Sequence, residues 1–195
     1  MRFRAGSDRT VAATIVALLL SACATPQAAL LDSFAAQLAA QPSATLALGQ
    51  WCGRQGFADP PLVTAQPVIG ASQAPPADAR TLLGIAADEP LAYRRVRLWC
   101  GGRVLSEADN WYVPARLTPA MNAALAASDV PFGRVAAPLG FIRERLAETR
   151  GAAPGCPPGT VLSHRGVLRL PDGRGLALVG ECYTAANLDR EETKT

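Results

Sequence analysis

The sequence predicts an α+β fold, a single antiparallel β-sheet with helices packed on one side. Strand-like segments come in two pairs joined by tight turns, at 91–113 and 160–184. Helix-like segments lie elsewhere, at 24–40 and 118–128, and do not alternate with single strands. The 195 residues, 49% of them hydrophobic, are enough for one domain with a packed core.

Each pair of strand-like segments has the pattern of a β-hairpin. In the first pair, 91–100 and 104–113 flank a Gly-Gly dipeptide, which is typical of tight turns. In the second pair, 160–170 and 175–184 flank a Pro-Asp-Gly turn. Further strands are expected at 62–69 and 141–147.

Helices are expected where apolar residues recur every three or four positions. The segment 24–40 has this spacing, at Leu31, Phe34 and Leu38. Thr118 is a favourable N-cap and Pro119 a favourable first residue for a helix that runs to about Ser128. Shorter helices are expected near 79–83 and 130–134.

The N-terminus has the organisation of an export signal. A basic start is followed by a ten-residue apolar run, too short to span a bilayer, and then by Leu20-Ser21-Ala22-Cys23. This order resembles the bacterial lipobox, in which the cysteine is lipidated. The alternative is an ordinary secretory cleavage site that happens to contain a cysteine. We favour a lipid anchor at Cys23 and a location in the cell envelope, facing the periplasm.

This interpretation divides the chain into four parts: a lipoprotein signal peptide (1–22), a tether (23–29), a globular domain (30–188) and a polar tail (189–195). Removal of the signal peptide lowers the net charge from +3 to +1, because it takes away three arginines and one aspartate. No basic tract remains that would indicate nucleic acid as a partner. We expect the protein to be a monomer.

Four cysteines remain after Cys23, and their even number in an exported chain predicts up to two disulfides with three open connectivities. They are Cys52, Cys100, Cys156 and Cys182. The sequence has no C-x-x-C motif and one histidine, His164, so neither a metal nor a cofactor is expected. His164 and Ser163 are adjacent in a strand and point to opposite faces, which argues against a catalytic pair.

The candidate functional residues are an arginine and a glutamate on apolar strand faces. Strand alternation places Arg94 on the apolar face of 91–100, and a buried charge needs a partner. Glu181 lies in 175–184, which is apolar on both faces and therefore central. The two side chains either form a salt bridge or lie at two ends of a pocket, with Arg94 binding a ligand carboxylate and Glu181 a ligand hydroxyl.

Three segments together resemble the chorismate pyruvate-lyase family: LAYRRVRLWCGGRVLSEADNWYVP (91–114), VPFGR (130–134) and LALVGECY (176–183). Their order and spacing match over about residues 30–188. The resemblance implies a chorismate lyase-like fold. It also implies a cofactor-free lyase that eliminates pyruvate from chorismate to give 4-hydroxybenzoate, a step of ubiquinone biosynthesis. The same fold also serves as a small-molecule-sensing domain of transcription regulators, so fold does not settle activity.

Carried over to this chain, the resemblance assigns roles to four residues. Arg94 corresponds to the arginine that grips the ring carboxylate, and Glu181 to the carboxylate that meets the ring 4-hydroxyl. Both would be catalytic and substrate-binding. Phe132 corresponds to a leucine that lines the site, and Ala44 loosely to a methionine position.

Two departures affect this assignment. Phe132 is larger than leucine and Ala44 smaller than methionine, which alters the expected pocket. The family's second arginine is absent, although Arg143 or Arg165 could supply its charge.

The compartment also bears on the function. Chorismate is made in the cytoplasm, so an exported lipoprotein would rarely meet it. The alternative is a non-catalytic envelope lipoprotein that binds a small aromatic or hydroxy carboxylate on the same scaffold.

Overall fold

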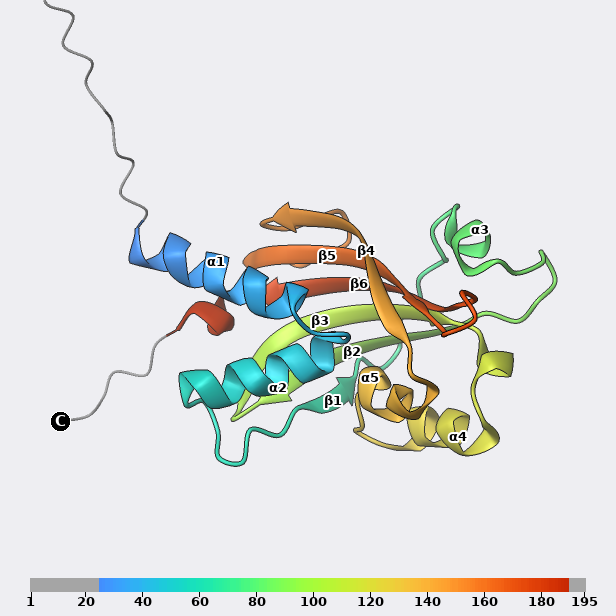
Figure 1. Ribbon diagram of the computed structural model, residues 1–195, viewed down its shortest axis with the longest axis horizontal. Helices are drawn as coiled ribbons and strands as arrows, with labels where there is room; N and C mark the ends of the chain where they lie inside the picture. Colours follow the sequence, from blue (N-terminus) through green and yellow to red (C-terminus); the bar gives the residue numbers. More distant parts are fainter. Residues whose placement is uncertain (1–24, 190–195) are drawn as a thin grey trace, which may run out of the picture.

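The computed structural model describes residues 25–189 and contains one six-stranded antiparallel sheet (Figure 1). Its strand order is β1-β2-β3-β6-β5-β4. The predicted hairpins are β2–β3 and β5–β6, and the pairing of β3 with β6 joins them. The predicted α+β class is therefore confirmed. The strands are β1 (Thr64–Pro67), β2 (Ala92–Cys100), β3 (Arg103–Tyr112), β4 (Ile142–Arg150), β5 (Thr160–Arg169) and β6 (Gly175–Thr184).

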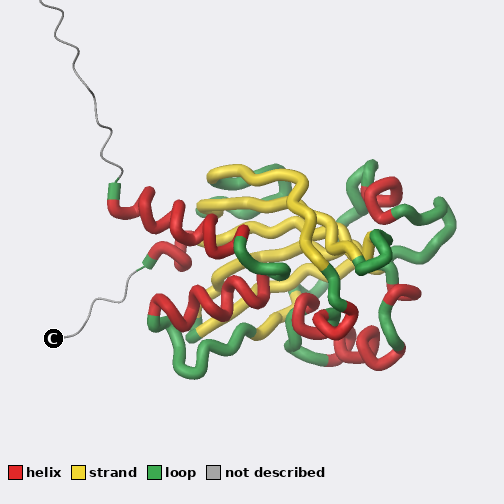
Figure 2. The backbone as a smooth tube through the Cα atoms, in the orientation of Figure 1, coloured by secondary structure: helices red, strands yellow, loops and turns green. Residues whose placement is uncertain are grey.

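Most of the helices cover one face of this sheet, which Figure 2 shows as a single layer of strands behind them. They are α1 (Pro26–Ala39), α2 (Ala44–Gln55), α4 (Pro119–Ala127) and α5 (Phe132–Val135). The short helix α3 (Ala79–Leu83) packs on the opposite face, against Trp111 and Leu178. Single 3₁₀ turns are η1 (Pro114–Arg116), η2 (Ala137–Leu139) and η3 (Ala185–Leu188).

The main helices begin where the sequence supplies a hydroxyl cap. Thr25 accepts a hydrogen bond from Ala28, Ser43 from Leu46, and Thr118 from Met121, each at 3.2 Å. Because α1 begins at Pro26, the tether expected over 23–29 gives way to helix within that range. The expected signal peptide and the lipidation site at Cys23 lie outside the described residues.

The space between the helices and the sheet contains the largest part of the core. Phe34 of α1, Trp51 of α2 and Tyr183 of β6 are fully buried there and pack ring against ring, with centroids 5.1–5.4 Å apart. The Trp51 indole donates a 3.0 Å hydrogen bond to the carbonyl of Asn187, which fastens η3 to α2. Helices α2 and α5 lie side by side, toward the β1–β2 side of the sheet (Figure 1).

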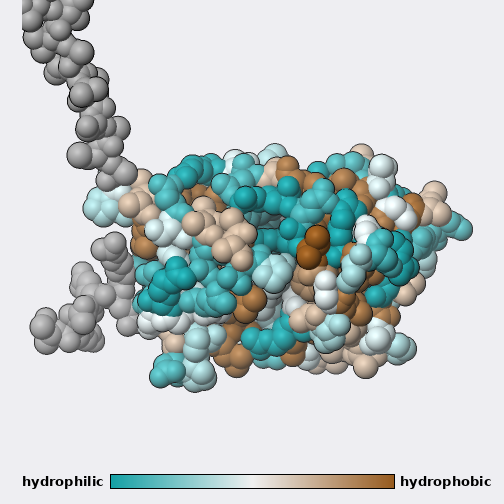
Figure 3. All heavy atoms as spheres, in the orientation of Figure 1, coloured by the Kyte–Doolittle hydropathy of each residue, from teal (hydrophilic) through white to brown (hydrophobic). Residues whose placement is uncertain are grey.

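One outer strand of the sheet, β4, is polar. Its sequence is IRERLAETR, most of its residues are exposed, and the surface above it in Figure 3 is mainly hydrophilic. Charged side chains on an edge strand discourage pairing with another chain. Within residues 25–189 no helix is long and apolar enough to cross a membrane.

Two disulfides tie peripheral segments to the sheet. Cys52–Cys100 joins α2 to β2, and Cys156–Cys182 joins the irregular segment 151–159 to β6. Strand alternation places Cys100 and Cys182 on opposite faces of the sheet, and each of them bonds to a different cysteine.

Removal of the Cys52–Cys100 disulfide should destabilise the fold strongly. The bridge closes a loop with a sequence separation of 48, for which the chain-entropy model gives about 4 kcal/mol. We expect the Cys52→Ala, Cys100→Ala double variant to lose roughly that free energy of unfolding in a urea titration. A loss below about 1 kcal/mol would show that the bridge contributes little.

Candidate functional site

Arg94 projects from β2 toward the connection between α4 and α5. Its side chain donates hydrogen bonds to the backbone carbonyls of Ser128 at 3.2 Å and Val130 at 3.3 Å. The residue is 8% exposed and forms no ion pair with any other residue in 25–189. Burial lowers the pKa of Arg94, and the nearby Tyr112 opposes this. Arg94 is therefore a buried cation held by neutral groups.

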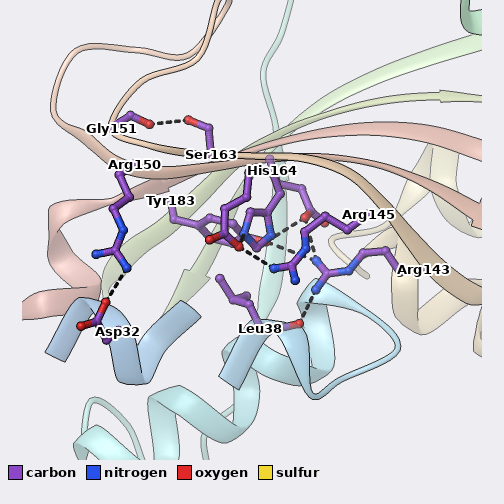
Figure 4. A network of polar contacts seen from close by, with 11 residues as sticks. Asp32, Leu38, Arg143, Arg145, Arg150, Gly151, Ser163, His164 and Tyr183 are labelled. Carbon is purple, nitrogen blue, oxygen red and sulfur yellow. Dashed lines mark hydrogen bonds and ion pairs between the residues drawn. The ribbon is translucent and has the colours of Figure 1, made fainter. Parts of the chain in front are cut away.

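Glu181 is also buried, at 6% exposure, but a different arginine neutralises it. Arg143 of β4 places a guanidinium nitrogen 2.8 Å from Oε2 of Glu181, and the Tyr183 hydroxyl donates to the same oxygen at 2.7 Å. Arg143 also donates to the carbonyl of Leu38 in α1 (Figure 4). Burial, and then the Glu181 carboxylate, raise the pKa of Tyr183 well above its ordinary value, so Tyr183 stays a donor.

Arg94 and Glu181 share a face of the sheet but do not meet. Arg94 is opposite Asn110 on β3, whereas Glu181 is opposite Ala108, two residues along the same strand. Two strand spacings and two residues place their Cα atoms about 12 Å apart, and each side chain has other partners. A direct salt bridge, one of the two arrangements left open by the sequence, is not formed.

A small cavity lies on this face and collects three of the four predicted site residues. Ala44, Phe132 and Glu181 line it together with Asn110, and its volume is about 30 Å³. Asn110 connects it to Arg94, because its side-chain amide donates to the Arg94 carbonyl at 3.5 Å. The cavity has room for one or two water molecules but is smaller than an aromatic ring requires.

A wider groove of about 590 Å³ runs along the outer side of this cavity, between α2 and α5. Both are lined by Ser43, Thr45 and Gly133, where the two helices meet. A Cβ atom on Gly133 would lie 2.9 Å from the Thr45 hydroxyl oxygen, so glycine permits the close approach. The contact between α2 and α5 therefore separates the inner cavity from the groove.

His164 is buried beside Glu181 and Tyr183, with contacts that the sequence did not indicate. It is 4% exposed, lies opposite Glu181 in the β5–β6 register, and packs edge-to-face on Tyr183 with centroids 5.2 Å apart. Its Nε2 is 3.0 Å from a carboxylate oxygen of Glu148, while its buried Nδ1 has no hydrogen-bond partner. Strand alternation can indicate that the His164 side chain faces the core. It cannot indicate which residue of β4 that side chain contacts.

Arg165, the other proposed source of the second positive charge, belongs to the opposite face of the sheet, where it pairs with Asp78. Of the two alternatives, Arg143 is therefore the one that reaches the face of Arg94 and Glu181. No group of three or more potential metal ligands occurs in the part of the chain that the structure describes.

The chain has a relative among known proteins. It is 39% identical over 180 residues to the uncharacterized protein y4mC of Sinorhizobium fredii, a match that covers 83% of this chain and 76% of y4mC. The chain therefore belongs to the y4mC family. No protein-family model matches it.

Solved structures share the fold at low sequence identity. PhnF from Mycobacterium smegmatis aligns with a TM-score of 0.53 at 12% identity, over 77% of this chain and 67% of PhnF. The effector domain of PhnF aligns with the same score at 13% identity, over 74% of this chain and 90% of that domain. A GntR-family transcriptional regulator from Enterococcus faecalis aligns at 11% identity with a TM-score of 0.47, over 67% of this chain and 99% of that chain.

These matches correct the family assignment suggested by the short motifs. Membership of the chorismate pyruvate-lyase family is wrong, because the chain belongs with y4mC and a solved structure that shares its fold is PhnF. The motifs record strand alternation and turn positions, which proteins of one fold share whatever their activity.

Loss of the Arg143 guanidinium should leave an uncompensated buried charge. We expect Arg143→Met to lower the free energy of unfolding by about 3–5 kcal/mol, because Glu181 then has no cation beside it. Urea titrations measure the loss. Combining Arg143→Met with Glu181→Gln should restore most of it. A double variant as unstable as the single one would contradict the charge explanation.

His164 should make stability depend on pH below neutrality. Burial lowers its pKa below the ordinary 6.5, so between the two values the unfolded chain binds a proton that the folded chain does not. The free energy of unfolding should therefore fall as pH decreases below about 6.5, with no contribution from His164 above it. His164→Gln should reduce this slope in denaturant titrations at pH 5 to 8. An unchanged slope would exclude His164 as its source.

Proposed function

We propose that this chain binds a small aromatic or hydroxy carboxylate between the sheet and the α2–α5 layer, with Arg94 contacting the ligand carboxylate. The observation that carries the proposal is the state of Arg94, a buried guanidinium whose hydrogen bonds go to two neutral carbonyls. A guanidinium presents five donors in a planar fork that matches a carboxylate. An anionic ligand would supply the counter-charge that the described residues do not.

The surroundings of Arg94 suit a flat ligand with one apolar side. The rings of Tyr112 and Phe132 lie 5.4 Å apart. Burial raises the pKa of Tyr112, and the positive charge of Arg94 partly opposes this, which places the phenol near that charge. Asn110 offers an amide in the same region. Because the cavity holds only about 30 Å³, ligand entry requires α5 to move away from α2.

The proposal is for binding rather than for elimination of pyruvate. Elimination would in addition require Glu181 to exchange a proton with substrate, whereas binding requires only that the Arg94 guanidinium be reached by the ligand carboxylate. One structural neighbour is described as an effector domain, which supports a binding role without chemistry.

Binding should depend on Arg94 and not on its neighbours in the strand. We expect benzoate and 4-hydroxybenzoate at millimolar concentration to raise the thermal unfolding midpoint of the full-length chain, and Arg94→Met to abolish the rise. Arg97→Met, on the opposite and more exposed face of β2, is the matched control and should respond like the native chain. Equal responses of the two variants, or none from the native protein, would refute the proposal.

We also propose that the protein acts in the cell envelope, anchored through a lipid on Cys23. The two disulfides support an oxidising compartment. Metabolic labelling with an alkyne palmitate in a bacterial host should label the native chain in the membrane fraction, and Cys23→Ala should lose the label. A native chain that stays unlabelled would exclude the anchor.

A further inference from the structure

A second pocket, of about 360 Å³, lies on the sheet face turned away from α1 and α2. Strands β3, β5 and β6 form its floor. One wall is Trp111 with the segment that precedes α3, and the other is the segment 151–156 with the Cys156–Cys182 disulfide. Its volume is within the range of small-molecule sites. It lies across the sheet from Arg94, although Val179 and Glu181 of β6 line both this pocket and the small cavity.

The floor of this pocket is open because Gly180 occupies the middle of the central strand β6. A Cβ atom built on Gly180 would meet nothing closer than the Asp109 Cβ at 4.0 Å, and its φ is not positive. By contrast, a Cβ on Gly166 would lie 3.0 Å from the Glu144 carbonyl oxygen, and one on Gly175 would lie 2.7 Å from Leu83. Packing therefore explains the other two strand glycines but not Gly180.

Glycine inside a strand costs stability, and without a packing reason it often marks a place where a ligand approaches the backbone. The pairing register puts Asp109 and Arg165 on either side of Gly180 in one row across the sheet. Their strands are two spacings apart, so the charged residues flank a gap with about 9.6 Å between their backbones. The missing side chain thus leaves a space on the pocket floor between the positions of Asp109 and Arg165.

The walls are held in place before any ligand arrives. The Trp111 indole donates to the carbonyl of Gln73 at 3.2 Å, which fixes one wall. On the other side, the Ser163 hydroxyl donates to Gly151 at 2.6 Å and accepts from the amide of Ala153 at 3.0 Å. The disulfide holds the same segment covalently. Such preorganisation lowers the cost of binding.

The charges around the pocket cancel, which limits what it can accept. Asp109, 6% exposed, accepts from the Tyr93 hydroxyl at 2.6 Å and lies 3.5 Å from Arg95. Arg165 makes a two-pronged contact with Asp78 at 3.0 and 2.5 Å. A ligand with a net charge would leave an imbalance in this partly buried space, whereas a zwitterion would not.

The geometry points to a site for a small zwitterion, with its ammonium group beside Asp109 and Trp111 and its carboxylate beside Arg165. An indole face attracts a desolvated cation, and most strongly one that is methylated and poorly hydrated. The ligand class is therefore a betaine or an amino acid, and the pocket operates independently of the carboxylate site at Arg94.

Isothermal titration calorimetry of the full-length chain tests the zwitterion site. The zwitterions are glycine betaine, glycine and proline. Choline lacks the carboxylate, and 3,3-dimethylbutanoate has the shape of glycine betaine without its positive charge. We expect at least one zwitterion to bind at least tenfold more tightly than both partial analogues. Failure of all three zwitterions, or a partial analogue that binds equally well, would overturn the proposal.

Gly180→Val supplies the decisive variant because the floor has room for a Cβ atom at this position and the valine methyl groups would extend into the pocket. We expect it to weaken zwitterion binding at least tenfold while raising the thermal midpoint of the free protein by about 2–4 °C. Gly180→Ala is the milder variant if valine disturbs folding. Arg94→Met should leave zwitterion binding unchanged, which separates the two sites. Unaltered binding by both Gly180 variants would exclude the pocket as the site.

Discussion

The antiparallel pairing of β3 with β6 is the constraint on which the rest of the structure depends. Each hairpin forms from local sequence, but only this pairing makes them one sheet. It places Glu181 on the same face as Arg94, and Gly180 beside Asp109 on the other. Both candidate binding sites are thus consequences of one register, since a slip of a single residue would exchange the two faces.

The buried pair of Arg143 and Glu181 determines which charges are available for function. Arg143 reaches across from the edge strand β4, neutralises Glu181 and also bonds to α1. A pair of this kind adds little net stability compared with apolar residues, but it is costly to break. Its consequence here is specific: Glu181 is already paired, and Arg94 is left as the buried cation without an acidic partner in the described chain.

Much of the fold could be predicted because its signals are local. Alternation identified the strands, the Gly-Gly and Pro-Asp-Gly turns joined them, and Thr118 with Pro119 marked the start of α4. The burial of Arg94 and Glu181 followed from the same alternation. The cavity could not be predicted, because its size depends on how closely α5 approaches α2, a contact between segments about 90 residues apart.

The sequence by itself determined the faces on which side chains lie, because a strand repeats every two residues regardless of its neighbours. It thereby placed Arg94 inside and disfavoured a Cys100–Cys182 bridge. Only the tertiary structure decided which charge meets which. Arg143 rather than Arg94 pairs with Glu181, His164 meets Glu148, and Gly180 opens a pocket, because each depends on strand order and packing between distant segments.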